Sequence, residues 1–141
     1  AHLDEIDGNI WTIPGEKMKG RKGKTPDFRV PLTPEALHVI KLAGQQQRDG
    51  YIFPGVKRGV ISDASMARLM ERRGLEARPH GFRSTLRVWL TESQQASREV
   101  AETIIAHQTG SLTERAYNRT DFLEQRRELM EAWERHLKST N

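Results

Sequence analysis

Two short segments near the start of the chain mix apolar and polar side chains in the alternation that predicts β-strands. These segments are residues 9–14 (NIWTIP) and 28–32 (FRVPL), and residues 17–26 between them are rich in Gly and Lys. A Gly-rich polar stretch between two strands indicates a turn, so the pattern predicts an antiparallel β-hairpin with a long basic tip. A third short strand is expected at residues 51–53, directly before Pro54.

Apolar side chains spaced three or four residues apart predict that helices fill most of the remaining chain. Thr33 followed by Pro34 marks a helix start, and that helix is expected to end near Ala43. Further helices are expected near Ser62-Asp63, after Pro79, near Arg98 and at Thr120-Asp121, and a short one leads to Tyr117. Their expected inward faces are Met66, Leu69 and Met70; Phe82, Leu86, Trp89 and Leu90; Val100, Ala101, Ile104 and Ile105; and Phe122, Leu129, Met130, Trp133 and Leu137. The sequence therefore predicts an α+β fold that is mainly helical, with a small antiparallel sheet.

Length and composition narrow the class of protein. A chain of 141 residues suits a single domain. No apolar run approaches the roughly 20 residues needed to span a membrane, so no membrane partner is expected. The absence of cysteine excludes disulfide scaffolds and cysteine-ligated zinc, and it fits an intracellular, cytoplasmic protein.

The net charge of +4 is distributed unevenly along the chain. Residues 17–29 hold six basic side chains against one acidic, and residues 57–91 hold eight against three. Two basic blocks between neutral or acidic segments indicate one positive face, for which a polyanion such as nucleic acid is the natural partner. Solvated surface charge explains the same blocks, and charge alone does not choose between the two interpretations.

Five side chains, taken in order, suggest phosphate chemistry. His80 and Arg83 lie one turn apart at a helix start, where the helix dipole favours an anion and a guanidinium can bind phosphate with two hydrogen bonds. His107 closes a later helix, and Tyr117 follows ten residues after it. The Tyr117 phenol could attack a phosphodiester held by these cations, while Lys19 gives a proton to the leaving alkoxide. Fixed cations then supply the charge that Mg²⁺ supplies in kinases, so neither a metal nor a cofactor is expected.

The motifs around these side chains follow one another over nearly the whole chain. They are Ile10-Trp11-Thr12-Ile13-Pro14 with Met18-Lys19, Arg29-Val30-Pro31-Leu32-Thr33, Pro79-His80-Gly81-Phe82-Arg83-Ser84, Ala106-His107, Ala116-Tyr117-Asn118-Arg119-Thr120 and Leu123-Glu124-Gln125-Arg126-Arg127. In this order they resemble the catalytic domain of tyrosine recombinases, in particular phage integrases of the P4-like type. The resemblance implies that residues 1–141 form the C-terminal part of an integrase catalytic domain with the tyrosine-recombinase fold.

The resemblance also implies a role for each matching residue. Tyr117 is the nucleophile that forms a 3′-phosphotyrosine. Arg83 and His107 bind the scissile phosphate, His80 assists as acid or base, and Lys19 is the general acid for the 5′-oxygen. The 5′-hydroxyl of a partner duplex then attacks each phosphotyrosine, so that strands are exchanged without ATP.

The implied partner is double-stranded DNA, bound by a homo-tetramer of the full-length protein, with accessory DNA-bending proteins in some systems. Lys22, Lys24 and Arg87 are expected to contact the DNA backbone. The implied setting is the cytoplasm of a bacterium, where the protein associates with the nucleoid when it is bound to DNA.

Two departures from the family pattern change what is expected of the chain. The loop from Lys19 to Pro31 is longer than usual and also holds Lys22 and Lys24, so the choice of general acid among the three lysines stays open. The family also uses an earlier Arg, just ahead of the segment that begins at Ala1. We therefore expect the upstream arm-binding, core-binding and first-arginine segments to be absent here, and the chain by itself to be feeble or inert.

Three other interpretations stay open. A non-catalytic basic DNA-binding module would use the same basic blocks, with Tyr117 as ordinary packing. A metal-dependent hydrolase would use His80 and His107, but these lack the i,i+4 spacing of paired helix ligands, and no carboxylate is expected close to them in sequence. A helical interaction domain would be built around the last helix.

Overall fold

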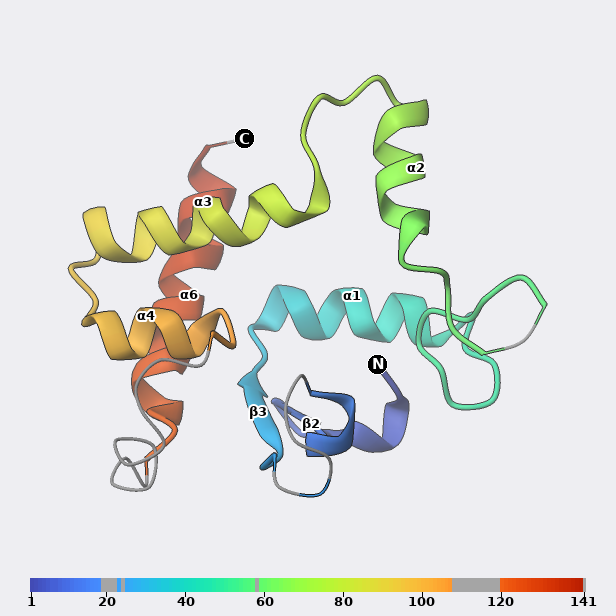
Figure 1. Cartoon of the computed structure of the whole chain (residues 1–141), viewed down its shortest axis with the longest axis horizontal. Coiled ribbons are helices and arrows are strands. Elements are labelled where there is room, and N and C mark those ends of the chain that lie inside the picture. The colour runs from blue at the N-terminus through green and yellow to red at the C-terminus, as the bar shows by residue number, and fades with distance from the viewer. Residues whose placement is uncertain (19–22, 24, 58, 108–119, 141) are drawn as a thin grey trace.

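A small β-sheet lies beside a group of helices, some of which are joined to one another by long loops (Figure 1). The computed structural model describes residues 1–18, 23, 25–57, 59–107 and 120–140. The elements in chain order, with η for a 3₁₀-helix, are η1 (Leu3–Glu5), β1 (Ile6–Asp7), β2 (Ile10–Ile13), η2 (Gly15–Lys17), β3 (Phe28–Pro31), α1 (Pro34–Gly44), α2 (Ala64–Arg72), α3 (Pro79–Glu92), α4 (Arg98–Ile104) and α6 (Leu123–Ser139). The predicted α+β, mainly helical class is confirmed.

The sheet is antiparallel, with the strand order β1-β2-β3. β2 and β3 form the predicted hairpin, in register from Ile10 opposite Pro31 to Ile13 opposite Phe28. β1 adds a strand that the sequence pattern did not predict, because two paired residues are too few to show an alternation. β3 contacts α6, so the hairpin places the sheet beside the N-terminal end of this helix.

The strand expected at residues 51–53 is wrong. Tyr51 forms only isolated bridges, with His2 and with Arg48. Ile52 is 1% exposed, and its amide donates to the carbonyl oxygen of Ala1 at 3.2 Å. Ile52 is therefore buried beside the first residue of the chain instead of joining the sheet, whereas Phe53 is 44% exposed.

The two arms of the hairpin approach each other closely where β2 ends. A Cβ atom at Gly15 would lie 1.8 Å from the backbone oxygen of Thr25, a distance that only a residue without a side chain permits. The Gly15 amide donates to Oδ1 of Asp27 at 2.8 Å. These contacts hold together the two ends of the loop that joins β2 to β3.

Glu5 connects the first turn of the chain to the hairpin. Its carboxylate accepts hydrogen bonds from Nε1 of Trp11 at 3.0 Å and from the amide of His2 at 3.1 Å, and it pairs with Nζ of Lys17. Burial acts to raise the pKa of Glu5, but the donors from Lys17, Trp11 and His2 outweigh it and lower the pKa to about 2. The charged carboxylate therefore holds η1, β2 and η2 together.

The predicted start of α1 is confirmed. The Thr33 hydroxyl accepts a hydrogen bond from the amide of Ala36 at 3.3 Å, and Pro34 occupies the first helical position. The amide of Glu35 donates to the carboxylate of Glu134 at 3.1 Å, and Lys138 pairs with Glu35 at 3.2 Å. The first turn of α1 is thereby attached to α6.

The apolar core lies where α3, α4 and α6 meet. In Figure 1, α4 runs back below α3 after a short connection, and α6 crosses both helices. Trp89 and Leu90 of α3 and Ala101 of α4 are buried, and Leu129 and Trp133 of α6 pack against them. The rings of Trp89 and Trp133 lie 5.0 Å apart. Removing this apolar surface from water is the main force that assembles the three helices.

Parts of the predicted inward faces are exposed instead. The exposed fractions are 51% for Met66, 46% for Leu69, 56% for Phe82 and 47% for Leu137. Figure 1 shows α2 standing away from the α3–α4–α6 group, and Met70 is the residue of α2 that is buried. An apolar stripe is buried only where another element covers it, which the periodicity of the stripe does not specify.

A buried arginine attaches the start of α6 to the sheet. Arg126 is 1% exposed, and it donates to the carbonyl oxygens of Asp121, at 3.0 Å, and of Arg29. Its guanidinium lies 4.8 Å from the centre of the Phe28 ring, a cation–π contact. Arg29 completes the cluster with two hydrogen bonds to the Asp121 carboxylate, at 2.8 and 2.9 Å.

Substitution Glu5→Gln should destabilise the fold by about 1–2 kcal/mol at pH 7, because it removes a charge-assisted hydrogen bond to Lys17. The folded-state pKa, about 2, lies below the ordinary value of 4.5, so the carboxylate stabilises the fold fully above pH 4.5. That stability is lost as the pH falls from 4.5 towards 2. Urea unfolding across this range should show the free-energy difference between Glu5→Gln and the unsubstituted protein shrinking as the pH falls. Asp7→Asn, at an exposed carboxylate, is the control and should have the same free energy of unfolding as the unsubstituted protein.

Substitution Arg126→Ala should lower stability by about 3 kcal/mol or more, because it leaves buried carbonyl oxygens without their donor and opens a cavity. The midpoint of thermal unfolding should fall by about 10 °C. Arg135→Ala on the exposed part of α6 is the matched control, expected within about 0.5 kcal/mol of the parent. Equal effects of the two substitutions would show that Arg126 does not hold α6 in place.

Candidate active site

α3 carries a row of basic side chains along one face. His80, Arg83 and Arg87 follow at intervals of three and four residues, the spacing that places side chains on the same face of a helix. Pro79 takes the first helical position. Within the described ranges, neither the His80 nor the Arg83 side chain forms a hydrogen bond or an ion pair. Both side chains are therefore available to an anion near the N-terminus of α3.

The end of α4 forms a Schellman motif. The amide of His107 donates to the carbonyl oxygen of Glu102 at 2.8 Å, and the amide of Ala106 donates to that of Thr103 at 2.9 Å. Ala106 takes the left-handed conformation that this motif requires, with a φ of 51°. The two ends of such a motif bring their side chains together, commonly as an apolar pair. Here the pair is a carboxylate and an imidazole.

Glu102 connects this imidazole to α3. Its Oε2 atom pairs with Nδ1 of His107, and its Oε1 atom accepts from Nε of Arg87 at 2.7 Å. A second guanidinium nitrogen of Arg87 lies 2.6 Å from the same oxygen. The structure therefore brings His107, at the end of α4, to the face of α3 that carries Arg83 and His80.

The carboxylate of Glu102 is enclosed and its partners are not. Glu102 is 3% exposed, whereas the side chains of Arg87 and His107 are 45% and 62% exposed. The hydrogen bond from His107 and those from Arg87 lower the pKa of Glu102 against the opposing effect of burial. The carboxylate therefore stays ionised beneath two donors that reach the surface.

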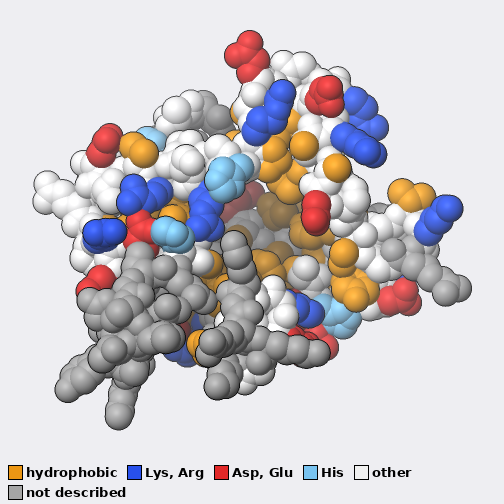
Figure 2. All heavy atoms as spheres, in the orientation of Figure 1, with side chains coloured by type: hydrophobic (Ala, Val, Ile, Leu, Met, Phe, Trp, Pro, Cys, Tyr) orange, Lys and Arg blue, Asp and Glu red, His pale blue; other side chains and the backbone are white. Residues whose placement is uncertain are grey.

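Figure 2 shows this face from outside. Histidine and Lys or Arg side chains gather over the part of the surface formed by α3 and α4. Such a group of donors on adjacent helices can bind a dianionic or monoanionic phosphate through hydrogen bonds and charge. Arg87, expected to be a DNA-backbone contact, also makes the internal ion pair with Glu102.

Four of the predicted site residues lie outside the described residues. These are Lys19, Lys22, Lys24 and Tyr117. Their roles, and the meeting of Tyr117 with Arg83, stay predictions. The described residues before and after the segment 108–119, which contains Tyr117, are anchored. The Schellman motif holds His107 on one side, and the Arg126 cluster holds the chain after Thr120 on the other.

The sequence analysis missed Glu102. It expected no carboxylate close in sequence to His107, and that expectation is wrong, since Glu102 lies five residues away and contacts the imidazole. The available signal was an acidic residue that follows Ala101 and precedes Ile105 by three positions, at the edge of the apolar face of a short helix. A charge at such a position requires a buried partner.

Other arginines, inside and outside the basic blocks, serve the fold. Arg78 donates to the carbonyl oxygens of Leu75, Glu76 and Ala77 at 3.0–3.1 Å, and it thereby orders the turn that leads into α3. Arg48 donates to backbone oxygens in the loop after Phe53. Basic charge in this chain is therefore partly structural, and His80 and Arg83 differ from these residues in having no such partner among the described residues.

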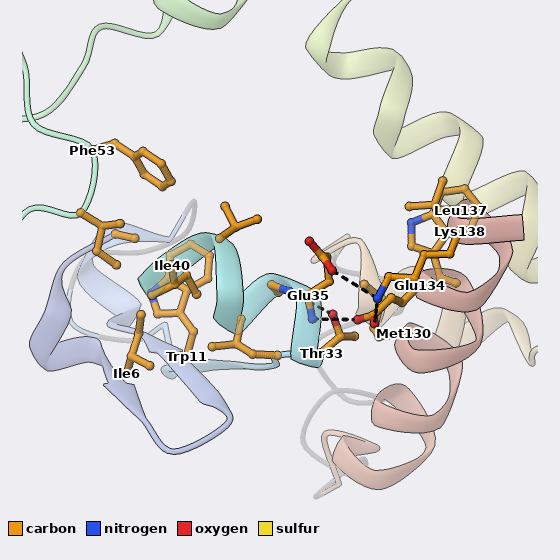
Figure 3. Close-up of a pocket in the computed structure, with 16 residues that line it drawn as sticks. Ile6, Trp11, Thr33, Glu35, Ile40, Phe53, Met130, Glu134, Leu137 and Lys138 are labelled. Atoms are coloured by element: carbon orange, nitrogen blue, oxygen red, sulfur yellow. Dashed lines mark hydrogen bonds and ion pairs between the residues drawn. The ribbon is translucent and has the colours of Figure 1, made fainter. Parts of the chain in front are cut away.

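An apolar groove of about 610 Å³ lies between the sheet, α1 and α6. Figure 3 shows Ile6, Trp11 and Ile40 on one side and Met130 and Leu137 on the other, with a few polar groups at the α6 rim. Such a lining offers van der Waals contact and no cluster of cations. The groove is therefore unsuited to phosphate chemistry.

The described residues contain no metal-ligand cluster and no membrane-spanning helix. In those ranges, no three His, Asp or Glu side chains gather in a way that could hold a metal ion. None of the described helices combines the length and the apolar character that crossing a membrane requires.

Comparison with known proteins shows which family the chain resembles. Residues 2–124 match the phage integrase family. The chain is 34% identical to prophage integrase IntA of Escherichia coli K12 in an alignment 143 positions long, which covers 94% of this chain. It is 32% identical to prophage integrase IntZ of the same organism, over 85% of this chain. The chain spans about a third of the length of these relatives, 33% and 30% respectively. No solved structure gives a significant match.

Substitution Ala106→Gly should stabilise the fold by about 0.5–1 kcal/mol, because glycine adopts the left-handed conformation without steric cost. Ala67→Gly, inside α2, is the matched control and should destabilise by about 1 kcal/mol. Chemical denaturation of the three proteins measures both changes. A loss of stability in Ala106→Gly would contradict the Schellman motif and with it the described position of His107.

Proposed function

The chain belongs to the phage integrase family, and from this premise we propose that it is part of a site-specific DNA recombinase that cuts and rejoins DNA through a phosphotyrosine intermediate. The observation that carries the proposal is the family match over residues 2–124. This range contains all five candidate residues, Lys19, His80, Arg83, His107 and Tyr117, in the expected order. The contact of His107 with Arg87 through Glu102 supports it, because it places His107 beside α3, the helix that begins with the motif of residues 79–84.

The proposed cleavage is an in-line displacement at phosphorus. The Tyr117 oxygen attacks the scissile phosphate and loses its proton to His80. The bond from phosphorus to the 5′-oxygen breaks, and Lys19 protonates the departing oxygen. The products are a 3′-phosphotyrosine and a free 5′-hydroxyl. Attack by the 5′-hydroxyl of a partner duplex reverses these steps and restores the phosphodiester, so the bond energy is conserved.

Arg83 and His107 are proposed to bind the non-bridging oxygens of the phosphate. Negative charge on these oxygens is shared in the transition state, and pre-positioned donors stabilise it without reorganisation. The lack of an internal partner for Arg83 within the described residues is what such a role requires. Lys22, Lys24 and Arg87 are proposed to contact neighbouring phosphates of the DNA backbone.

The proposed partner is double-stranded DNA, on which a homo-tetramer of the full-length protein assembles with accessory bending proteins where the site requires them. The proposed setting is the bacterial cytoplasm, at the nucleoid. Because the resemblance puts a further catalytic Arg ahead of Ala1, we expect the 141-residue chain on its own to cleave DNA feebly. Activity is therefore best measured in the intact integrase.

The nucleophile can be tested with a nicked DNA substrate that traps the covalent complex. Tyr51 and Tyr117 are the two tyrosines of this chain, so Tyr51→Phe is a matched control. In the intact integrase, Tyr117→Phe should abolish the covalent adduct and leave salt-dependent DNA binding unchanged. Tyr51→Phe keeps the ring that packs edge-on against His2, and it should retain the adduct.

Two outcomes would contradict the proposal. An adduct that survives Tyr117→Phe would mean that another group is the nucleophile. DNA binding without any adduct in the unsubstituted protein would favour the non-catalytic DNA-binding module. Mass spectrometry of the trapped complex, with nucleotide mass expected on the peptide that contains Tyr117, distinguishes the two cases.

A further inference from the structure

Glu102 lies beneath two donors that come from different helices. Arg87 of α3 and His107 after α4 are the hydrogen-bond partners of the Glu102 side chain in the part of the chain that the structure describes. The carboxylate itself is 3% exposed and so cannot reach a phosphate at the surface. Any effect of Glu102 on an external anion must therefore pass through Arg87 and His107.

The contact with His107 gives the imidazole a defined orientation. Nδ1 faces the Glu102 carboxylate, so Nε2, on the opposite edge of the ring, faces away from it. The side chain is 62% exposed, which leaves that edge accessible from solvent. A carboxylate on Nδ1 favours the proton at that nitrogen and fixes the plane of the ring.

The contact with Arg87 has the same form. Nε and one terminal nitrogen meet Oε1 of Glu102, and 45% of the side chain is exposed. The guanidinium has five N–H donors, so donors remain for a second acceptor. Arg87 lies one helical turn from Arg83, on the same face of α3.

We propose that Glu102 is a positioning residue for the phosphate chemistry of this site: it orients Nε2 of His107 towards the scissile phosphate and the outer edge of Arg87 towards the DNA backbone beside it. The inference rests on the proposed function. Apolar side chains would close the Schellman motif equally well, and a buried ion pair is on balance little better for stability than well-packed apolar residues. A carboxylate at this position is explained by what it does to its two exposed partners.

The first test measures cleavage in the intact integrase. Glu102→Gln should slow formation of the covalent adduct by about 10- to 100-fold, because it removes the charge that orients both donors. The dissociation constant for DNA should change by less than about threefold, since the phosphate contacts outside the site remain. Glu99→Gln, at an exposed carboxylate one turn earlier on α4, is the matched control and should cleave like the unsubstituted protein.

The second test uses NMR to determine whether the hydrogen bond between Glu102 and His107, on which the proposal depends, is present in solution. The unsubstituted protein should show a downfield, exchange-protected Nδ1 proton resonance, assigned by its loss in His107→Gln. It should also disappear in Glu102→Gln and persist in Glu99→Gln. Absence of the resonance in the unsubstituted protein overturns the proposal, even if Glu102→Gln fails to fold.

Cleavage by folded Glu102→Gln at the rate of Glu99→Gln also overturns the proposal. If Glu102→Gln does not fold, Glu102→Asp is measured in its place, with slowed cleavage at unchanged DNA affinity as the supporting result and an unchanged rate as the contrary one. Failure of the proposed function is recognised separately, because the unsubstituted protein would then form no Tyr117 adduct. The resonance would still decide whether Glu102 orients His107.

Discussion

The buried carboxylate of Glu102 determines how the two helices of the candidate site meet. A charge that is 3% exposed is tolerated only where it is paired, and Glu102 is paired with Arg87 from α3 and with His107 after α4. The apolar core between α3, α4 and α6 sets the same arrangement from the other side. Packing thus brings the helices together, and the ion pairs select which polar side chains face outward between them.

Two anchors flank residues 108–119, the segment that contains the predicted nucleophile. On one side, the Schellman motif ends α4 and holds His107 by its backbone and its side chain. On the other side, Arg126 and Arg29 bind Asp121 and attach the start of α6 to β3. The described chain therefore enters and leaves this segment at fixed points, each of them built around a charged group with several partners.

Local sequence patterns predicted the secondary-structure elements better than they predicted which faces of those elements are buried. The Thr33-Pro34 start of α1 and the pairing of residues 10–13 with 28–31 needed only capping and alternation, which depend on neighbours in sequence. Whether an apolar face would be covered depended on which elements meet. Phe82 is therefore exposed although it continues the stripe of Trp89, and Ile52 is buried beside the N-terminus while residues 51–53 form no strand.

The sequence by itself determined the mainly helical class, the hairpin, the basic blocks and the order of the motifs that resemble the family, because capping, periodicity and residue chemistry are properties of short segments. The tertiary structure alone decided that Glu102 joins His107 to Arg87, that Arg126 anchors α6, and that several arginines serve the fold. A buried charge is stable only beside partners brought together by packing. Those partners lie on separate elements, and no pattern within one segment can specify them.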